Sequence, residues 1–141
     1  MNNKKGFTLI ELVLVISIVA LLLMAIGLTS GVNENARVHA AAEAVKSLRT
    51  AAESYIAAGN MTYTGVSIAG LQTAGYLPAN FSATGSNPWG GNYSIAVNSD
   101  PNKVDISLTG VSATASARLS ALFTNSASAT NYASTTWTAT F

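Results

Sequence analysis

A single acid stands at the start of a long apolar segment near the N-terminus of the chain. Two lysines precede Gly6, and the apolar run 7–28 follows, with Glu11 as its only charged residue. A carboxylate in such a helix costs about 2.5–3.5 kcal/mol at the centre of a bilayer and less towards its interface. No basic residue lies one helical turn from Glu11 within the run. The sequence therefore predicts that another group must come to this carboxylate.

Length and composition exclude several classes of protein. The 141 residues suffice for one compact domain and an N-terminal segment. Charged residues make up 9% of the chain, against roughly 25% in ordinary globular proteins. The net charge is +1 and the only basic cluster is the lysine pair at positions 4 and 5, which argues against specific nucleic-acid binding. Cysteine is absent, so neither disulfide bonds nor thiolate chemistry is available.

Three interpretations compete for residues 1–30. A secretory signal peptide would have a cleavage site of small residues after its apolar stretch, but here a helical pattern continues beyond that point. A plain signal anchor fits the length, because residues 7–28 span roughly 33 Å as a helix, enough to cross a hydrocarbon core. Neither interpretation explains why Glu11 is tolerated.

The third interpretation accounts for the acid. Residues 5–11, KGFTLIE, resemble the N-terminal signature of type IV pilins and of the pseudopilins of type II secretion. The resemblance implies that a membrane peptidase cuts between Gly6 and Phe7 and that the same enzyme methylates the new amine of Phe7. Residues 1–6 are then the leader peptide, and Glu11 is the acid that acts in assembly.

The physics of an apolar helix agrees with this interpretation. The freed amine of Phe7 is a cation at the end of that helix, and it is as costly in lipid as the carboxylate of Glu11. If the amine of one subunit meets Glu11 of a neighbour, one contact neutralises both charges. The two groups are also one turn apart within a subunit, so pairing inside one helix is the alternative.

The chain departs from the family pattern in two respects. Many pilins have a proline late in the apolar segment, where this chain has none. Gly27 and Gly31 instead weaken the helix by about 1 kcal/mol each relative to alanine. Many members also close a C-terminal loop with a disulfide bond, which a chain without cysteine cannot form. Strand pairing or the next subunit must hold that loop.

Residues 31–58 change to an amphipathic helical pattern. Apolar residues recur at steps of three and four, which predicts one buried stripe: Val38, Ala41, Val45, Leu48, Ala52 and Tyr55. Gly59 with Asn60 marks the end of the helix. We therefore predict one helix over 7–58, roughly 75–80 Å long, whose residues 7–30 enter a membrane or a filament core. Because the stripe is short and rich in alanine, packing against a sheet is favoured over a coiled coil.

Residues 59–141 carry the pattern of a small globular part. The predicted elements are a short helix over 67–74, a turn at 87–91, hairpin strands over 93–97 and 104–108, a helix over 112–123, a polar linker, and a last strand over 135–141. This order predicts an α+β fold of the type IV pilin kind. In it an antiparallel sheet of three or four strands covers the stripe of the long helix.

Alternation and helical spacing predict the buried side of each of these elements. One face of the first strand carries Tyr93, Ile95 and Val97. The apolar side of the second short helix carries Ala115, Leu119, Leu122 and Phe123. The turn at 87–91 is predicted to be structural, with Trp89 buried in it.

Few residues suit catalysis or metal binding. His39 is the only histidine and has no second ligand beside it, so a surface or contact role is predicted. Asp100 and Asp105 on the hairpin fall short of the roughly 6–8 ligands that calcium takes. No motif of a catalytic triad, a phosphate loop or a zinc site is present. We therefore predict no catalytic residue, no cofactor and no metal site, and a protein that is not an enzyme.

The resemblance implies a structural subunit of a type IV pilus. Its precursor is anchored in the bacterial inner membrane and is processed by the prepilin peptidase and methyltransferase. The inner-membrane assembly machinery then polymerises it with identical subunits into an extracellular filament. Adhesion, motility and DNA uptake stay open as tasks of that filament.

Alternatives to a bulk pilus subunit remain. One is a pseudopilin of a type II secretion system, although the acidic, calcium-binding C-terminal loop of major pseudopilins has no counterpart here after Asp105. A minor pilin at the filament tip is another. Outside the family, the alternative is a signal-anchored ectodomain that binds a ligand as a monomer.

Overall fold

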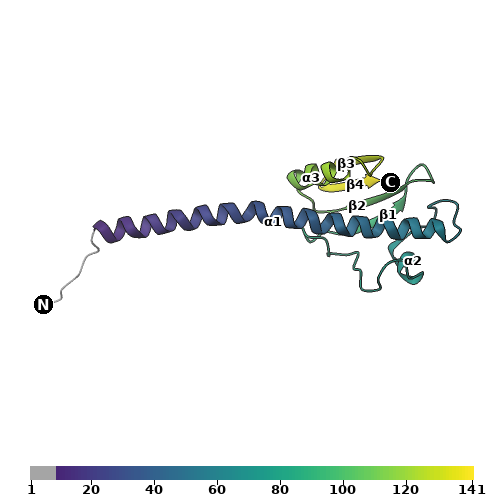
Figure 1. Ribbon diagram of the computed structural model, residues 1–141, viewed down its shortest axis with the longest axis horizontal. Helices are drawn as coiled ribbons and strands as arrows, with labels where there is room; N and C mark the ends of the chain where they lie inside the picture. The colour runs from purple at the N-terminus through teal and green to yellow at the C-terminus, as the bar shows by residue number, and fades with distance from the viewer. Residues whose placement is uncertain (1–8) are drawn as a thin grey trace. The chain divides into compact units, whose positions relative to one another are not determined.

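The computed structural model describes the backbone of residues 9–141 and the side chains of residues 10–20 and 33–141. The chain divides into two compact units, Met1–Asn35 and Ala36–Phe141. Its elements are α1 (Leu9–Ala57), α2 (Ile68–Thr73), β1 (Tyr93–Val97), β2 (Val104–Leu108), α3 (Ala113–Phe123), β3 (Ala129–Ala133) and β4 (Thr136–Thr140) (Figure 1). The predicted cleavage site at Gly6 and Phe7 lies outside the described residues.

Helix α1 runs without interruption from Leu9 to Ala57. The prediction of one long helix is therefore confirmed for the described part of its range. The hydroxyl of Ser17 donates to the carbonyl of Val13 at 2.8 Å, so this polar side chain is satisfied within the helix. Within the part of the chain that the structure describes, no helix combines the length and the apolar character needed to cross a membrane.

The predicted stripe of α1 is buried in the second unit. Val38, Ala41, Val45, Leu48 and Ala52 are at most 3% exposed, whereas Tyr55 is partly buried at its margin. Charged side chains pair on the other faces of the helix. The Nζ of Lys46 lies 2.8 Å from Glu43 and the Nε of Arg49 lies 2.8 Å from Glu53.

Helix α1 ends where the sequence predicts. Gly59 has a φ of +105°, a left-handed conformation that glycine adopts without steric cost. Its amide donates to the carbonyl of Ile56 at 3.0 Å. The side-chain amide of Asn60 donates to the carbonyl of Tyr55 at 2.8 Å, so two terminal carbonyls of the helix have partners.

The four strands form one antiparallel sheet in the order β1-β2-β4-β3. Tyr93 is paired with Leu108, Leu108 with Trp137, and Trp137 with Tyr132. Paired residues share a face, so these four form one row across the sheet. A single cluster of buried residues joins this face to the stripe of α1. The prediction that the stripe packs against a sheet is confirmed.

Helix α3 packs over the same face of the sheet. Its N-cap is Ser112, and the Ser112 hydroxyl accepts from the amide of Ala115 at 3.2 Å. The ring of Phe123 lies 5.6 Å from that of Trp137. The indole Nε1 of Trp137 donates to the hydroxyl of Ser120 at 3.0 Å, so this fully buried tryptophan also has its polar atom satisfied.

The segment between α3 and the last strand was predicted as a linker, but it contains β3. All five residues of β3 are exposed, so the strand shows no alternation of buried and exposed apolar residues. β3 pairs with β4 through its backbone, and the register runs from Ala129 opposite Thr140 to Ala133 opposite Thr136. The sheet therefore has four strands, the upper of the two predicted numbers.

Three side chains are more exposed than predicted. Leu122 is 49% exposed because Ala115, Ser116, Leu119 and Phe123 form the buried side of α3. Val97 is 38% exposed because it ends β1 at the hairpin turn. Trp89 is only partly buried at the edge of the core, and Trp137 is the fully buried tryptophan.

Candidate assembly site

Glu11 lies in the first turn of α1 and is exposed. A carboxylate near the N-terminal end of a helix is stabilised by the helix dipole by about 0.3–1 kcal/mol at an exposed position. The helix dipole therefore favours an acid at this position, but this stabilisation does not remove the cost of placing the acid in an apolar environment.

The apolar side chains around Glu11 are exposed as well. Between Ile10 and Val19 the exposed fractions of the large hydrophobic residues range from 48% to 74%. These residues are Ile10, Leu12, Val13, Leu14, Val15, Ile16, Ile18 and Val19. They point in all directions around the helix, because they occupy almost every position of more than two turns.

Such a surface is suited to an apolar surrounding rather than to water. Burying one aliphatic side chain of this size gains about 1.5–3 kcal/mol, and monomeric soluble proteins rarely expose a contiguous apolar patch of this extent. A helix that is apolar on every side is covered either by lipid or by other apolar helices. The described part of α1 thus presents Glu11 on a helix that needs such a cover.

Of the predicted assembly residues, Glu11 is the one that the structure describes. Gly6 and Phe7 lie outside the described residues. Cleavage after Gly6, methylation of Phe7 and the pairing of its amine with Glu11 stay predictions.

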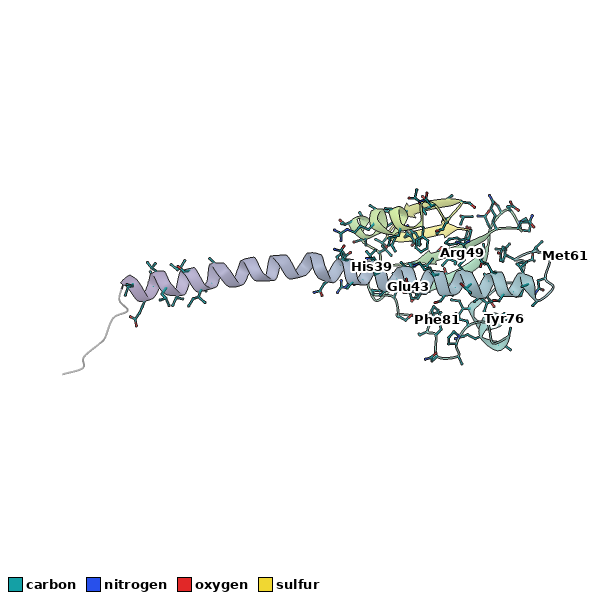
Figure 2. The ribbon with its side chains drawn as sticks, viewed as in Figure 1. His39, Glu43, Arg49, Met61, Tyr76 and Phe81 are labelled. Carbon is teal, nitrogen blue, oxygen red and sulfur yellow. The ribbon has the colours of Figure 1, made fainter. Side chains whose placement is uncertain are left out.

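The residues that could bind a metal or act as a base are either exposed or engaged in structural hydrogen bonds. His39 is exposed on α1 (Figure 2). The carboxylate of Asp105 accepts from Asn98 at 2.8 and 2.9 Å and from the Thr140 hydroxyl at 2.6 Å, which ties the hairpin to β4. Asp100 accepts from the amide of Asn102 at 3.0 Å. Among the described residues, no group of three or more potential metal ligands gathers in one place.

The turn before β1 is organised by Asn87, which is 4% exposed. Its Oδ1 accepts from the amides of Trp89 at 3.0 Å and Gly91 at 2.8 Å. Its Nδ2 donates to the carbonyl of Thr109 at 2.7 Å. A Cβ on Gly91 would lie 2.0 Å from that same carbonyl oxygen, so only glycine fits there. The structural role predicted for this turn is supported, with Asn87 as its centre.

Two phenols have altered acidity in the second unit. Burial raises the pKa of Tyr93 above its ordinary value. Burial and the charge of Glu53 raise the pKa of Tyr63, and the nearby Arg49 opposes this. Both hydroxyls therefore stay neutral over the physiological range, and neither suits proton transfer near neutral pH.

Comparison with known protein families decides where the chain belongs. The family model described as the prokaryotic N-terminal methylation motif matches residues 1–27, and the model described as PilS N terminal matches residues 24–140. The chain belongs to the PilS N-terminal family. No curated protein and no solved structure matches it.

This PilS-family chain is a type IV pilin-like protein. A long N-terminal helix followed by a four-stranded antiparallel sheet is consistent with the α+β type IV pilin fold, so the predicted fold class and family are confirmed. The methylation motif implies processing by a prepilin peptidase and assembly into a pilus. It also indicates a membrane-anchored precursor that becomes extracellular.

Sequence reasoning missed one hollow in the second unit. A shallow cavity of about 400 Å³, widely open to solvent, lies between α1, β1 and the segment that joins α2 to β1. Its walls come from Ala44, from residues 78–86 and from Tyr93. The lining residues are scattered over three segments without a shared motif, so no sequence signal could have found this cavity.

Proposed function

We propose that this PilS-family chain is the structural subunit of a type IV pilus filament. The observation that carries the proposal is the exposed apolar surface of residues 10–19 directly behind a prepilin methylation motif. In the precursor lipid covers this surface, and in the filament the same segments of identical subunits cover it. The role is structural, not catalytic.

The proposal assigns one task to each part of the chain. Residues 1–6 are a leader that the prepilin peptidase removes, and Phe7 becomes the methylated first residue. Residues 7–30 move from the inner membrane into the filament core, and residues 31–58 hold the globular part, residues 59–141, at the filament surface. The support for the last two tasks is the contrast between exposed apolar residues 10–19 and the buried stripe that begins at Val38.

Assembly in this scheme is a transfer between two apolar surroundings. Lipid tails are as apolar as leucine, so the helices gain little hydrophobic free energy when they leave the membrane. Extraction therefore has to be driven by the inner-membrane assembly machinery. Glu11 sets the register between neighbouring subunits, because its carboxylate in an apolar surrounding costs free energy unless the Phe7 amine of a neighbour pairs with it.

The test replaces Glu11 by valine in cells that make the filament. Glu11→Val removes the charge and suits an apolar helix, so the precursor is expected to enter the membrane at the normal level while surface filaments are lost. Ser17→Ala is the matched control, since Ser17 lies on the same segment and its hydroxyl bonds only within the helix. Filaments are counted by electron microscopy, and the precursor is quantified in isolated membranes.

Two outcomes would contradict the proposal in different ways. Normal filaments from Glu11→Val would remove Glu11 from assembly. A parent strain that makes no surface fibre from this chain, but loses protein secretion when the chain is deleted, would identify a pseudopilin instead.

A further inference from the structure

The cavity beside α1 is built from an irregular segment with a fixed shape. The side-chain amide of Gln72 donates to the carbonyls of Pro78, Ala79 and Phe81 at 3.2, 3.3 and 2.8 Å. The amide of Phe81 donates to the carbonyl of Pro78 at 3.0 Å. These bonds hold the wall of the cavity in place without a ligand, and small-molecule sites are usually preformed in this way.

Two aromatic rings form the apolar part of the lining. The rings of Phe81 and Tyr93 have centroids 5.6 Å apart and planes inclined at 49°. Figure 2 shows Phe81 on the segment between α2 and β1, beside the C-terminal half of α1. The amide of Tyr93 donates to the carbonyl of Ala83 at 2.8 Å, so the strand that carries the second ring is fastened to the same segment.

The hydroxyl of Tyr93 is the polar group that points to a ligand. Tyr93 is only 6% exposed and lines the cavity. Its hydroxyl has no hydrogen-bond partner among the described residues, while every fully buried side-chain polar atom in that part of the chain has one. The hydroxyl is therefore not itself fully buried but is open to solvent in the cavity, and an oxygen or nitrogen of a bound molecule would take the place of solvent as its partner.

The remaining lining residues are uncharged. Hydroxyls and an amide come from Asn80, Ser82 and Ser86, and the other residues are Ala44 and Pro78. An ionic ligand would lose its hydration without gaining a counter-charge. A pure hydrocarbon would leave the polar groups unpaired. The lining therefore suits a molecule with both apolar C–H faces and several neutral hydroxyls.

We propose that this cavity binds a neutral saccharide unit. The volume of about 400 Å³ lies in the range of roughly 300–1,000 Å³ that small-molecule sites occupy. The C–H face of a pyranose ring matches the aromatic wall of Phe81, and its hydroxyls match Tyr93 and Asn80. This inference is independent of the filament, since every lining residue lies in the unit Ala36–Phe141.

The experiment measures binding to the full-length chain in lauryldimethylamine oxide, a detergent without a sugar headgroup. Saturation-transfer NMR is run with the methyl glycosides of glucose, galactose, mannose and N-acetylglucosamine. Glucose 6-phosphate and N-acetylneuraminic acid serve as anionic probes. At least one neutral glycoside is expected to bind, and both anions are expected to bind more weakly than it does.

Two variants connect the binding to the cavity. Tyr93→Phe removes one hydroxyl and keeps the ring, and it is expected to raise the Kd of the bound glycoside about 3- to 10-fold, as the loss of one hydrogen bond does. Tyr76→Phe is the matched control, because Tyr76 does not line the cavity, and its Kd is expected to equal that of the parent. Circular dichroism confirms that both variants keep the fold.

Three results would overturn the inference. They are the absence of saturation transfer to every neutral glycoside at tens of millimolar, a Kd unchanged by Tyr93→Phe, and tighter binding of the anionic probes. If a second copy of the chain occupies the cavity instead, no glycoside binds and Phe81→Leu lowers self-association. That result too would contradict a saccharide site, but it would leave the proposed pilus function untouched.

Discussion

The guanidinium carbon of Arg49 lies 4.9 Å from the centroid of the Phe141 ring. The same guanidinium donates to Glu53 through Nε at 2.8 Å and to the carbonyl of Ser126 through Nη1 at 3.3 Å. The Phe141 ring in turn meets Phe123 edge-on, with centroids 5.8 Å apart. Arg49 of α1 thus contacts both the last residue of the chain and the loop that follows α3. These contacts hold the C-terminal end of a chain that has no cysteine.

Arg49→Ala is expected to destabilise the second unit by about 1–2 kcal/mol, since it removes a cation–π contact and the packing of the arginine stem. Urea unfolding followed by tryptophan fluorescence measures the change. The matched control is Lys46→Ala, whose partner Glu43 is 73% exposed, and it is expected to cost less than about 0.5 kcal/mol. Equal effects of the two substitutions would show that the Phe141 contact contributes nothing.

Asn87→Ala is expected to cost about 2–4 kcal/mol, because it leaves partly buried backbone groups of Trp89, Gly91 and Thr109 without their Asn87 partners. Asn125→Ala, at an exposed asparagine, is the control and is expected to change the free energy of unfolding by less than about 0.5 kcal/mol. The comparison uses the same urea titration. A small effect at Asn87 would mean that water replaces these bonds freely and that the turn is not held by this side chain.

The hairpin between β3 and β4 turns through Ser134 and Thr135 with φ values of +48° and +63°. Left-handed backbone costs a side-chain-bearing residue roughly 1–2 kcal/mol, and such two-residue turns favour Asn-Gly. The double substitution Ser134→Asn, Thr135→Gly is therefore expected to raise the thermal midpoint by several degrees.

The control for this hairpin is Thr124→Gly. Thr124 caps α3 with a φ of −51°, so glycine gains nothing there, adds freedom to the unfolded chain and loses the bond from the Thr124 hydroxyl to the carbonyl of Ser120. This variant is therefore expected to lower the midpoint. A double variant at positions 134 and 135 that also lowers the midpoint would contradict the left-handed turn.

Alkaline pH is expected to destabilise the second unit through its phenols. The folded pKa values of Tyr63 and Tyr93 lie above the ordinary value of 10.0. Their contribution is therefore complete below about pH 10 and is lost as the pH rises through the raised values. Tyr93→Phe is expected to make the fall of unfolding free energy above pH 10 shallower. A fall as steep as in the parent chain would show that Tyr93 does not contribute.

The sequence predicted those parts of the fold in which the spacing of apolar residues indicates which side chains are buried. The stripe from Val38 to Ala52 repeats at helical spacing and is buried as expected. The alternation in β2 likewise places Val104, Ile106 and Leu108 in the core. In both elements the core is on one side, so polar residues have to occupy the other.

The remaining features depend on contacts between distant segments. β3 has five exposed side chains, so only its backbone pairing with β4 makes it a strand. The contact of Arg49 with Phe141 and the cavity walls at Ala44 and Tyr93 join residues far apart in the sequence. No local pattern encodes such contacts, and they become visible only when the sheet closes over α1.

The predicted assembly site likewise has one part that the sequence indicates and one part that it does not. The acid in the apolar run identified Glu11 before any coordinates, because the cost of a carboxylate in an apolar environment follows from the sequence alone. Glu11 is exposed at the start of α1, and its role in assembly stays a prediction. The partner of the site comes from processing and from other subunits, which a single chain does not contain.

Intact-mass measurement of the chain isolated from surface filaments tests the central claim most directly. The account predicts a polypeptide that begins at Phe7, lacks residues 1–6 and is heavier by one methyl group on its terminal amine. A filament-borne chain that retains Met1, or that begins at any residue other than Phe7, would contradict it.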